Sequence, residues 1–476
     1  MKKINYIASF CLLFLLVSCS DDFLEPVPTS AISGASFFST EAQLETAVVN
    51  MYDGIQGVNA LELTSSNLNH AVQVEFYLTE MRSDNTRTKS SEGEAAQFES
   101  YTIESTNGIV DDYYRSFYNV IFRANTVLEN LGVASEETAM AFEAEAKFVR
   151  AYAHFNLVRL FGDIPMVDKI VRVSESDVQY VRVAKETIYD FIISDLQTAI
   201  DGLDNSSVNR ASKAAAQALL AKVYLTTGDN YTEAQVLCES IMGGSYALET
   251  DFKDVFYNES NSEVIFSVGY APDNVNDSQN FSAEWLNAVG RTAGVNYVTT
   301  EARMALDEMG GNRTPLSYRQ DALQPTQYQV VKYLPNGDES LDIDATSNDP
   351  TSAGNDWIVI RYADVLLMHV EAILAGGQTT SVSAALNSFQ QVRNRAGLTD
   401  AVSSITKQML LDERRVELAF ENHRFYDLVR FGVAQDVLSE FSSANGYSFS
   451  GTDLLLPIPQ REINLSNGLL NQNPGY

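Results

Sequence analysis

The helical spacing of apolar residues constrains the fold of this chain more than any other feature. Between Phe142 and Leu160, apolar side chains recur every three or four residues, and Gly162 and Pro165 follow directly. Such spacing gives a helix one apolar face, and glycine and proline favour its end. Three further segments share the pattern and end beside glycine: Ala211–Thr227, Ile358–Ala375 and Lys407–Phe431. The pattern predicts an all-α fold.

A weak repeat indicates that these helices form pairs. The segment Leu220–Ala234, with Gly228 near its centre, nearly matches the tetratricopeptide pattern, although its last tyrosine and alanine lie one place late. In that pattern small residues let two helices pack closely, and a glycine separates them. A second pair is expected over Val365–Arg395, around Gly376. Two unrelated helical hairpins remain the alternative.

Long segments without helical spacing separate the helices. They are polar, and two are rich in Asn, Gly and Asp: Arg82–Ile109, Tyr270–Thr300 and Gln320–Asn355. Long loops on a rigid scaffold commonly carry function. A short strand is expected at Val264–Val268. The predicted architecture is therefore paired helices with long loop-rich segments and a few short strands.

The first residues resemble a lipoprotein signal. Two lysines precede the apolar run Ile7–Val17, which is too short for a permanent membrane span but suits a secretory signal. Leu16–Cys19 resembles the bacterial lipobox, in which the leader is removed before a cysteine that carries lipid. We therefore expect residues 1–18 to be a signal peptide and Cys19 to anchor the chain to a membrane. An ordinary signal peptide is the alternative.

Charge and cysteine content narrow the range of partners. The formal net charge of −31 argues against binding to nucleic acid or to an anionic lipid surface. After removal of the leader and lipidation of Cys19, Cys238 is the only thiol left, so no intramolecular disulfide is expected.

Motifs for catalysis or cofactor binding are missing from the sequence. The chain has no GxSxG elbow, no Walker A loop and no GxGxxG followed by a helix. Its four histidines share no metal-binding spacing. Adjacent carboxylates such as Asp111 and Asp112 arise by chance among 63 acidic residues. We therefore expect no enzyme activity, no cofactor and no metal.

Several sequence blocks, in order from Cys19 to the last residue, carry a family resemblance. The blocks are Cys19–Glu25, Glu145–Pro165, Asn209–Ala234, Ser262–Tyr270, Ile360–Ala372, Val392–Leu398, Leu410–Gly432 and Leu454–Tyr476. Together they resemble the SusD/RagB family of bacterial surface lipoproteins. The resemblance implies one SusD-like domain over residues 19–476, built on about four tetratricopeptide-like pairs. Its N-terminal part would extend to about residue 320 and its C-terminal part over about 321–476.

The resemblance also implies a function and a location. Family members are non-catalytic lipoproteins that face the exterior on the cell outer membrane. They capture oligosaccharide or polysaccharide and pass it to a SusC-like TonB-dependent transporter. Ser20, Asp21 and Asp22 resemble the acidic surface-export signal that follows the lipidated cysteine. A peptide-binding relative and an outer-membrane glycoside hydrolase are the alternatives.

Exposed aromatic side chains in the long loops are the expected ligand contacts, because sugar recognition uses flat apolar faces with a polar handle. Trp285 lies in the polar segment Tyr270–Thr300 and is the first candidate. A core tryptophan is the alternative reading of Trp285. Trp357 adjoins the helix expected from Ile358 onward and is expected to pack against the core.

The loop after Asn85 is the second place where ligand contacts are expected. Many family members have tryptophans there, but this chain has Arg87 and Lys89. These two cations would bind carboxylate or sulfate groups. Together with an acidic composition that suits salty water, they favour an anionic algal polysaccharide. Two solvated loop cations are the alternative. The predicted ligand residues are Trp285, Asn85, Arg87, Lys89, Phe98 and Tyr101.

Overall fold

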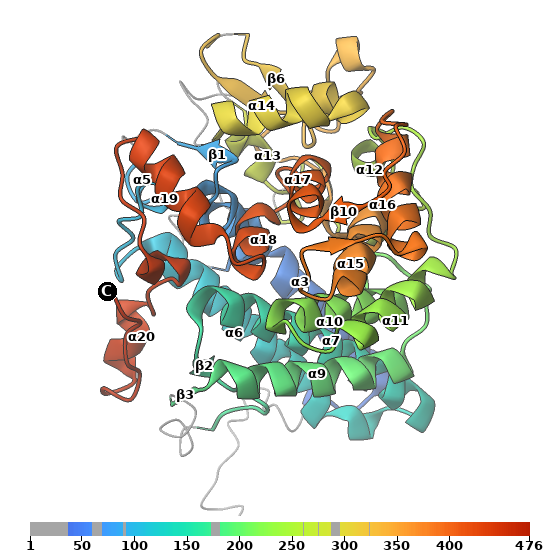
Figure 1. The fold of residues 1–476 in the computed structure, drawn as a ribbon. Helices are drawn as coiled ribbons and strands as arrows, with labels where there is room; N and C mark the ends of the chain where they lie inside the picture. Colours follow the sequence, from blue (N-terminus) through green and yellow to red (C-terminus); the bar gives the residue numbers. More distant parts are fainter. Residues whose placement is uncertain are drawn as a thin grey trace, which may run out of the picture.

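Helices account for most of the structure, and the strands form short antiparallel pairs (Figure 1). The computed structural model describes residues 37–59, 69–88, 92–172, 181–259, 261–274, 276–286, 296–322 and 324–476. Among these residues, no helix combines the length and the apolar character that a membrane span requires. The predicted mostly helical fold with a few short strands is confirmed.

The longer helices pack against one another in chain order. They are α3 (Glu41–Gln56), α6 (Gly108–Glu129), α7 (Glu136–Phe161), α9 (Lys185–Gly202), α10 (Lys213–Thr227), α11 (Tyr231–Met242), α15 (Tyr362–Leu374) and α16 (Ser383–Arg395). Helix α6 packs on α3 and α7, α9 on α7 and α10, and α11 on α10 and α15. Both predicted pairs, α10 with α11 and α15 with α16, are therefore present as packed neighbours (Figure 1).

Many of the shorter elements lie above α6, α7, α9 and α10 in the view of Figure 1. The shorter α-helices are α4 (Glu75–Leu78), α5 (Ala96–Ser100), α12 (Asp254–Tyr257), α13 (Phe281–Glu284), α14 (Thr300–Met309), α17 (Lys407–Glu417), α18 (Arg424–Arg430), α19 (Ala434–Ala444) and α20 (Gln460–Leu465). The 3-10 turns are η4 (Ala71–Val74), η5 (Glu80–Arg82), η6 (Leu131–Val133), η8 (Gly311–Leu316), η9 (Glu339–Leu341) and η10 (Gly451–Leu454).

The strands form antiparallel pairs, and the pairs β1–β5 and β4–β8 join segments that lie far apart in the sequence. The antiparallel pairs are β1 (Thr86–Arg87) with β5 (Tyr297–Val298), β2 (Ile164–Pro165) with β3 (Arg182–Val183), β4 (Val264–Val268) with β8 (Trp357–Arg361), β6 (Tyr318–Gln320) with β7 (Tyr328–Val330), and β9 (Thr379–Thr380) with β10 (Ile405–Thr406). The strand expected at Val264–Val268 is confirmed as β4.

Helix ends follow the local signals in the sequence. The Ser135 hydroxyl accepts a hydrogen bond from the Thr138 amide at the start of α7, and Gly162 caps its end with φ 71°. Gly228 adopts the left-handed conformation after α10, and its amide donates to the Tyr224 carbonyl. The predicted helices over Phe142–Leu160 and Ala211–Thr227 are therefore confirmed, with their glycine ends.

Two other predicted helices differ from the observed elements. The segment from Ile358 starts as strand β8, because its β-branched residues pair with β4, and the helix begins only at Tyr362. The helix expected over Lys407–Phe431 is broken between α17 and α18, where Phe420 and Asn422 have φ values of 66° and 61°. This break places the Asn422 amide 2.9 Å from the buried Glu80 carboxylate, to which it donates.

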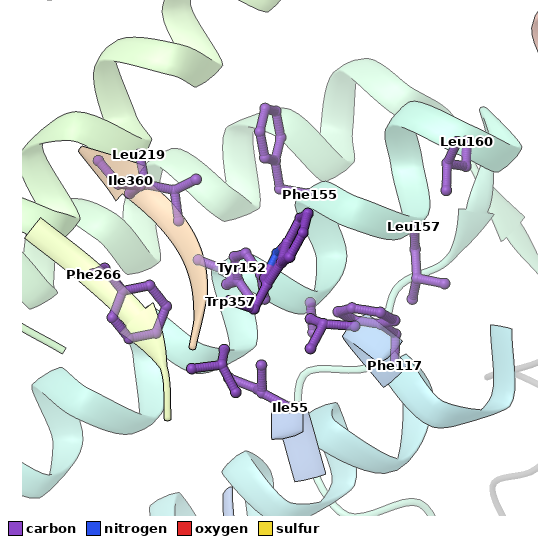
Figure 2. Packing of buried hydrophobic residues seen from close by; sticks show 14 of the residues in the cluster. Ile55, Phe117, Tyr152, Phe155, Leu157, Leu160, Leu219, Phe266, Trp357 and Ile360 are labelled. Carbon is purple, nitrogen blue, oxygen red and sulfur yellow. The ribbon is translucent and has the colours of Figure 1, made fainter. Parts of the chain in front are cut away.

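The main core lies where the β4–β8 pair meets α7. Phe266 of β4 packs edge-on against Phe148 and Tyr152 of α7, with ring centroids 5.2 and 6.3 Å apart (Figure 2 shows Phe266 and Tyr152). Each fully buried phenylalanine contributes about 1.5–3 kcal/mol to stability. Trp357 is buried between Phe281 and Tyr333, so its predicted packing role is confirmed.

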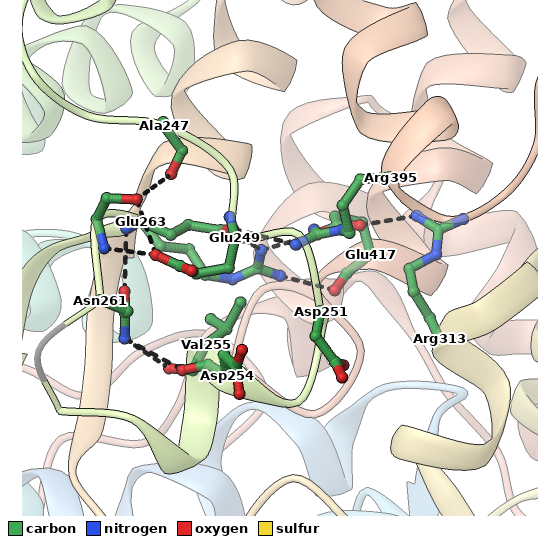
Figure 3. Close-up of polar contacts among 12 residues, drawn as sticks. Ala247, Glu249, Asp251, Asp254, Val255, Asn261, Glu263, Arg313, Arg395 and Glu417 are labelled. Carbon is green, nitrogen blue, oxygen red and sulfur yellow. Dashed lines mark hydrogen bonds and ion pairs between the residues drawn. The ribbon is translucent and has the colours of Figure 1, made fainter.

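Buried ion pairs connect β8 with the C-terminal helices. Arg361 places Nη1 2.7 Å from Glu263 Oε1 and 2.6 Å from Glu417 Oε1. Its Nε lies 2.7 Å from Glu421 Oε2. Arg395 also contacts both Glu263 and Glu417 (Figure 3). Because a buried carboxylate is costly unless it is paired, Arg361 determines how these segments meet.

Candidate ligand-binding surface

Strands β1 and β5 bring Arg87 beside Tyr297. The two residues are partners in the ladder, and Arg87 Cζ lies 5.9 Å from the Tyr297 ring centroid. Arg87 Nη2 lies 3.0 Å from Glu99 Oε1, and Nη1 donates to Asn445 Oδ1 at 2.5 Å. These contacts hold the guanidinium in place, but 29% of the Arg87 side chain stays exposed. Arg87 is thus held in one position and still accessible to solvent.

Two C-terminal arginines fix the segment that leads into β1. Asp84 Oδ1 lies 2.7 Å from Arg424 Nε, and Asp84 Oδ2 lies 3.0 Å from Arg415 Nη2. Burial by itself would raise the pKa of Asp84, but the two guanidinium groups hold it below its ordinary value. The Thr299 hydroxyl, directly after β5, donates to the Asp84 carbonyl at 2.8 Å. The position of Arg87 therefore depends on residues more than 300 positions away.

A second group of aromatic and cationic side chains lies next to this pair. Strand β7 packs beside β5 and carries Tyr328. Arg303 of α14 stacks on that ring, with Cζ 3.8 Å from the centroid. Tyr318 of β6 meets Tyr328 edge-on at 5.8 Å, and its hydroxyl donates to Asp307 Oδ1 at 2.5 Å. Burial and the neighbouring Asp307 carboxylate raise the pKa of Tyr318 to about 12.

We call these two groups together the tyrosine–arginine surface. Its members are partly buried and come from β1, β5, α14, β6, β7 and the turn after α19: Arg87, Tyr297, Arg303, Tyr318, Tyr328 and Tyr447. Burial raises the pKa of the Tyr297 hydroxyl, and the nearby Tyr447 acts in the same direction. Half-exposed tyrosine rings with planar cations offer apolar faces to sugar C–H groups and donors to sugar oxygens.

The structure places most of the predicted ligand residues inside the protein. Asn85 is 1% exposed, and its side-chain oxygen accepts from Arg415 Nε at 3.0 Å. Phe98 is fully buried against Tyr77, and the Tyr101 hydroxyl donates to the Arg82 carbonyl at 3.0 Å. The expectation that these three side chains are exposed in a loop is wrong, because β1 and α5 fold the segment onto the core.

Trp285 differs most from its predicted position. It is 1% exposed and packs against Phe76, Tyr333 and Phe420, with ring centroids 5.4–6.1 Å apart. The single turn of α13 ends at Trp285 and places the indole among these rings. The expected exposure of Trp285 is wrong, and the alternative of a core tryptophan describes its position.

The remaining predicted residues cannot be placed. Cys19, Ser20, Asp21, Asp22 and Lys89 lie outside the described residues. Of the predicted ligand residues, Arg87 is the one that the structure brings to the tyrosine–arginine surface.

Sequence reasoning missed five members of this surface. Four of them, Tyr297, Tyr318, Tyr328 and Arg303, lie in or beside the long polar segments, so the composition of these segments was a signal. Tyr447 follows α19, outside these segments. The sequence did not show that these residues lie together, because their grouping depends on the β1–β5 pair and on the packing of β7 beside β5. Within the described residues, no cluster of three or more His, Cys, Asp or Glu side chains could hold a metal ion.

Comparisons with known families and curated proteins match almost the whole chain. A family model described as "SusD family" matches residues 316–476, and one described as "Starch-binding associating with outer membrane" matches residues 22–225. SusD-like protein P2 of Formosa agariphila is 27% identical, with all of both chains covered. Starch-binding protein SusD of Bacteroides thetaiotaomicron is 23% identical over 76% of this chain and 78% of its own length.

Solved structures share the fold. A laminarin-binding SusD-like protein is 27% identical, with a TM-score of 0.76 over 92% of this chain and all of its own. Surface glycan-binding protein A from Bacteroides thetaiotaomicron, solved with laminarihexaose, is 20% identical, with a TM-score of 0.76 over 91% of this chain and 99% of its own.

A helical scaffold that presents a fixed, partly exposed set of tyrosines and arginines is typical of a binding protein. The class that the fold and the comparisons define is an outer-membrane-associated, non-catalytic surface protein. Within that class, the chain belongs to the SusD/RagB family.

Proposed function

We propose that this chain captures oligosaccharide or polysaccharide on the cell exterior and delivers it to a SusC-like TonB-dependent transporter. The tyrosine–arginine surface carries the proposal, because it joins partly exposed aromatic rings to planar hydrogen-bond donors. The names of two relatives, one laminarin-binding and one starch-binding, support a glycan as the ligand. Arg87 favours an anionic polysaccharide. The acidic composition suits a salty environment and therefore favours an algal source.

Replacement of Tyr297 tests this binding surface. Tyr297→Ala removes a stacking face worth about 1.4 kcal/mol, so we expect affinity for the bound glycan to fall about tenfold. Phe122→Ala is the matched control, since Phe122 is 52% exposed on α6 and outside the tyrosine–arginine surface. Calorimetry of the full chain in detergent against laminarin, starch, alginate and carrageenan oligosaccharides measures both. Tight peptide binding without glycan binding would favour the peptide-binding alternative.

We propose further that Cys19 carries lipid and that residues 19–476 form one SusD-like domain. The signal peptide over residues 1–18 would be removed during export. Asp21 and Asp22 would direct the lipoprotein to the outer face of the membrane. Changing both to alanine is expected to leave lipidation intact but to lower digestion by external protease on whole cells. Unchanged digestion would contradict the export role.

The transporter partner is open to a direct test. A SusC-like protein is expected to co-purify with the lipidated chain from outer membranes. Absence of any TonB-dependent transporter from the purified complex would contradict this part of the proposal.

A further inference from the structure

Arg303 is a partly buried cation that forms no ion pair with the described residues. Its guanidinium stacks on Tyr328 at 3.8 Å, and Nη2 donates to the Thr300 hydroxyl at 3.2 Å. Nε is shielded from solvent and has no hydrogen-bond partner. Within the described ranges, no carboxylate oxygen lies within 4.0 Å of its guanidinium nitrogens. Asp307, one turn further along α14, accepts from the Tyr318 hydroxyl instead.

The two arginines nearest to this group, Arg87 and Arg319, each have a carboxylate partner. Arg87 is paired with Glu99 at 3.0 Å. Arg319, on β6 beside Tyr318, pairs with Asp338 at 2.5 Å and donates to Gln329 at 2.9 Å. Other arginines in the described part of the chain also lack an ion pair, but they donate to several oxygens of the scaffold. Arg159 donates to the Phe155 carbonyl and to Asn156 Oδ1, and Arg182 donates to the Asp163 and Asn471 carbonyls. Among the described residues, Arg303 donates to the Thr300 hydroxyl alone.

The chemistry of this group fits an acidic ligand. A guanidinium that stacks on a ring keeps its edge free, and two parallel N–H groups on that edge match a carboxylate or sulfate. Nη1 of Arg303 makes no hydrogen bond to the described residues. The rings of Tyr328 and Tyr318 stand edge-to-face, so they offer an apolar wall for the sugar that bears the acid.

We infer that Arg303, Tyr328 and Tyr318 form an acid-binding subsite that holds a carboxylate or a sulfate group of the captured glycan. This inference rests on the proposed function. A protein with net charge −31 repels a polyanion at long range. The subsite supplies the local attraction that such a ligand needs. Attraction at contact is screened less by salt than the long-range repulsion is.

Paired glycan probes test the inference on the full chain in detergent. Alginate oligosaccharide and its carboxyl-reduced form test carboxylate, and carrageenan oligosaccharide and its desulfated form test sulfate. Laminarihexaose is the neutral probe. We expect one acid-bearing probe to bind at least tenfold more tightly than its neutral counterpart. Arg303→Gln should abolish this preference, and Arg319→Gln, which removes an already paired cation, should preserve it.

The outcomes separate the subsite from the proposed function. If neutral probes bind and no acid-bearing probe is preferred, or if Arg303→Gln retains the preference, the subsite is wrong while glycan capture stands. If no glycan binds at all, the proposed function itself fails. If Arg303→Gln unfolds below the temperature of the assay, Arg303→Lys serves instead. Lysine keeps the charge but lacks the planar edge of the guanidinium, so we expect the preference for the acid-bearing probe to fall three- to tenfold. Full retention of the preference would overturn the inference.

Discussion

Glu75 provides a test of the buried electrostatics in this fold. It lines a cavity of about 60 Å³ between α7, α10 and α18 and is 5% exposed. Burial raises its pKa to about 7, although Arg159 and Lys222 act in the opposite direction. Glu75 is therefore a carboxyl group that the folded protein keeps protonated until near neutrality.

The size of the effect follows from proton linkage. In the unfolded chain Glu75 titrates near 4.5, so the folded state binds more protons between pH 4.5 and about 7. The contribution of protonated Glu75 to the free energy of unfolding is fully present below pH 4.5 and is lost as the pH rises through about 7. A difference of roughly 2.5 pKa units corresponds to about 3 kcal/mol.

Glu75→Gln removes this titration while it keeps the shape of the side chain. The variant should match the wild type at pH 4.5 and exceed its free energy of unfolding by about 3 kcal/mol at pH 8. For a chain of this size, that difference raises the melting temperature by about 3 °C. Urea unfolding at intervals from pH 4.5 to 8 measures it. Glu440→Gln, an exposed position on α19, is the control. If Glu75→Gln changed the free energy of unfolding by the same amount at pH 4.5 and at pH 8, the reasoning would be refuted.

Two further predictions concern stability. Arg361→Met should lower the free energy of unfolding by about 3–5 kcal/mol, because it removes a cation from the buried carboxylates of Glu263, Glu417 and Glu421. A loss below 1 kcal/mol in chemical unfolding would mean that Arg395 and Lys332 balance these carboxylates without Arg361. Trp285→Ala should lower the free energy of unfolding by about 3–5 kcal/mol, measured by thermal and urea unfolding. Unchanged stability with weakened glycan binding would restore the exposed-ligand reading of Trp285.

Helices were predictable because their signals are local. The spacing of apolar residues and the glycine after each helix placed the C-terminal ends of α7 and α10 to within one residue, although α7 begins at Glu136, before the predicted Phe142. The same spacing wrongly predicted one continuous helix through α17 and α18. The chain breaks near Phe420, where the Asn422 amide contacts Glu80, a residue far away in the sequence. Local patterns carry no information about such distant partners.

The candidate site was harder to predict for a related reason. Trp285 lies among polar neighbours in the sequence, but Phe76, Tyr333 and Phe420 come from three distant segments to cover it. Arg87 was found because a cation in a long loop stands out by itself. Its tyrosine partner could not be found, because only folding brings residues 87 and 297 together.

The contact of Asp84 with Arg424 has a consequence for biosynthesis. The two residues are 340 positions apart, so the segment that carries Arg87 stays without its final support until almost the entire polypeptide has emerged. The helices from α6 to α10 can pack earlier, since their contacts are short-range. The part of the tyrosine–arginine surface that carries Arg87 therefore completes its contacts late in synthesis. A premature stop before residue 424 would remove the support of Arg87, even though Tyr447 is the single member of the tyrosine–arginine surface among the missing residues.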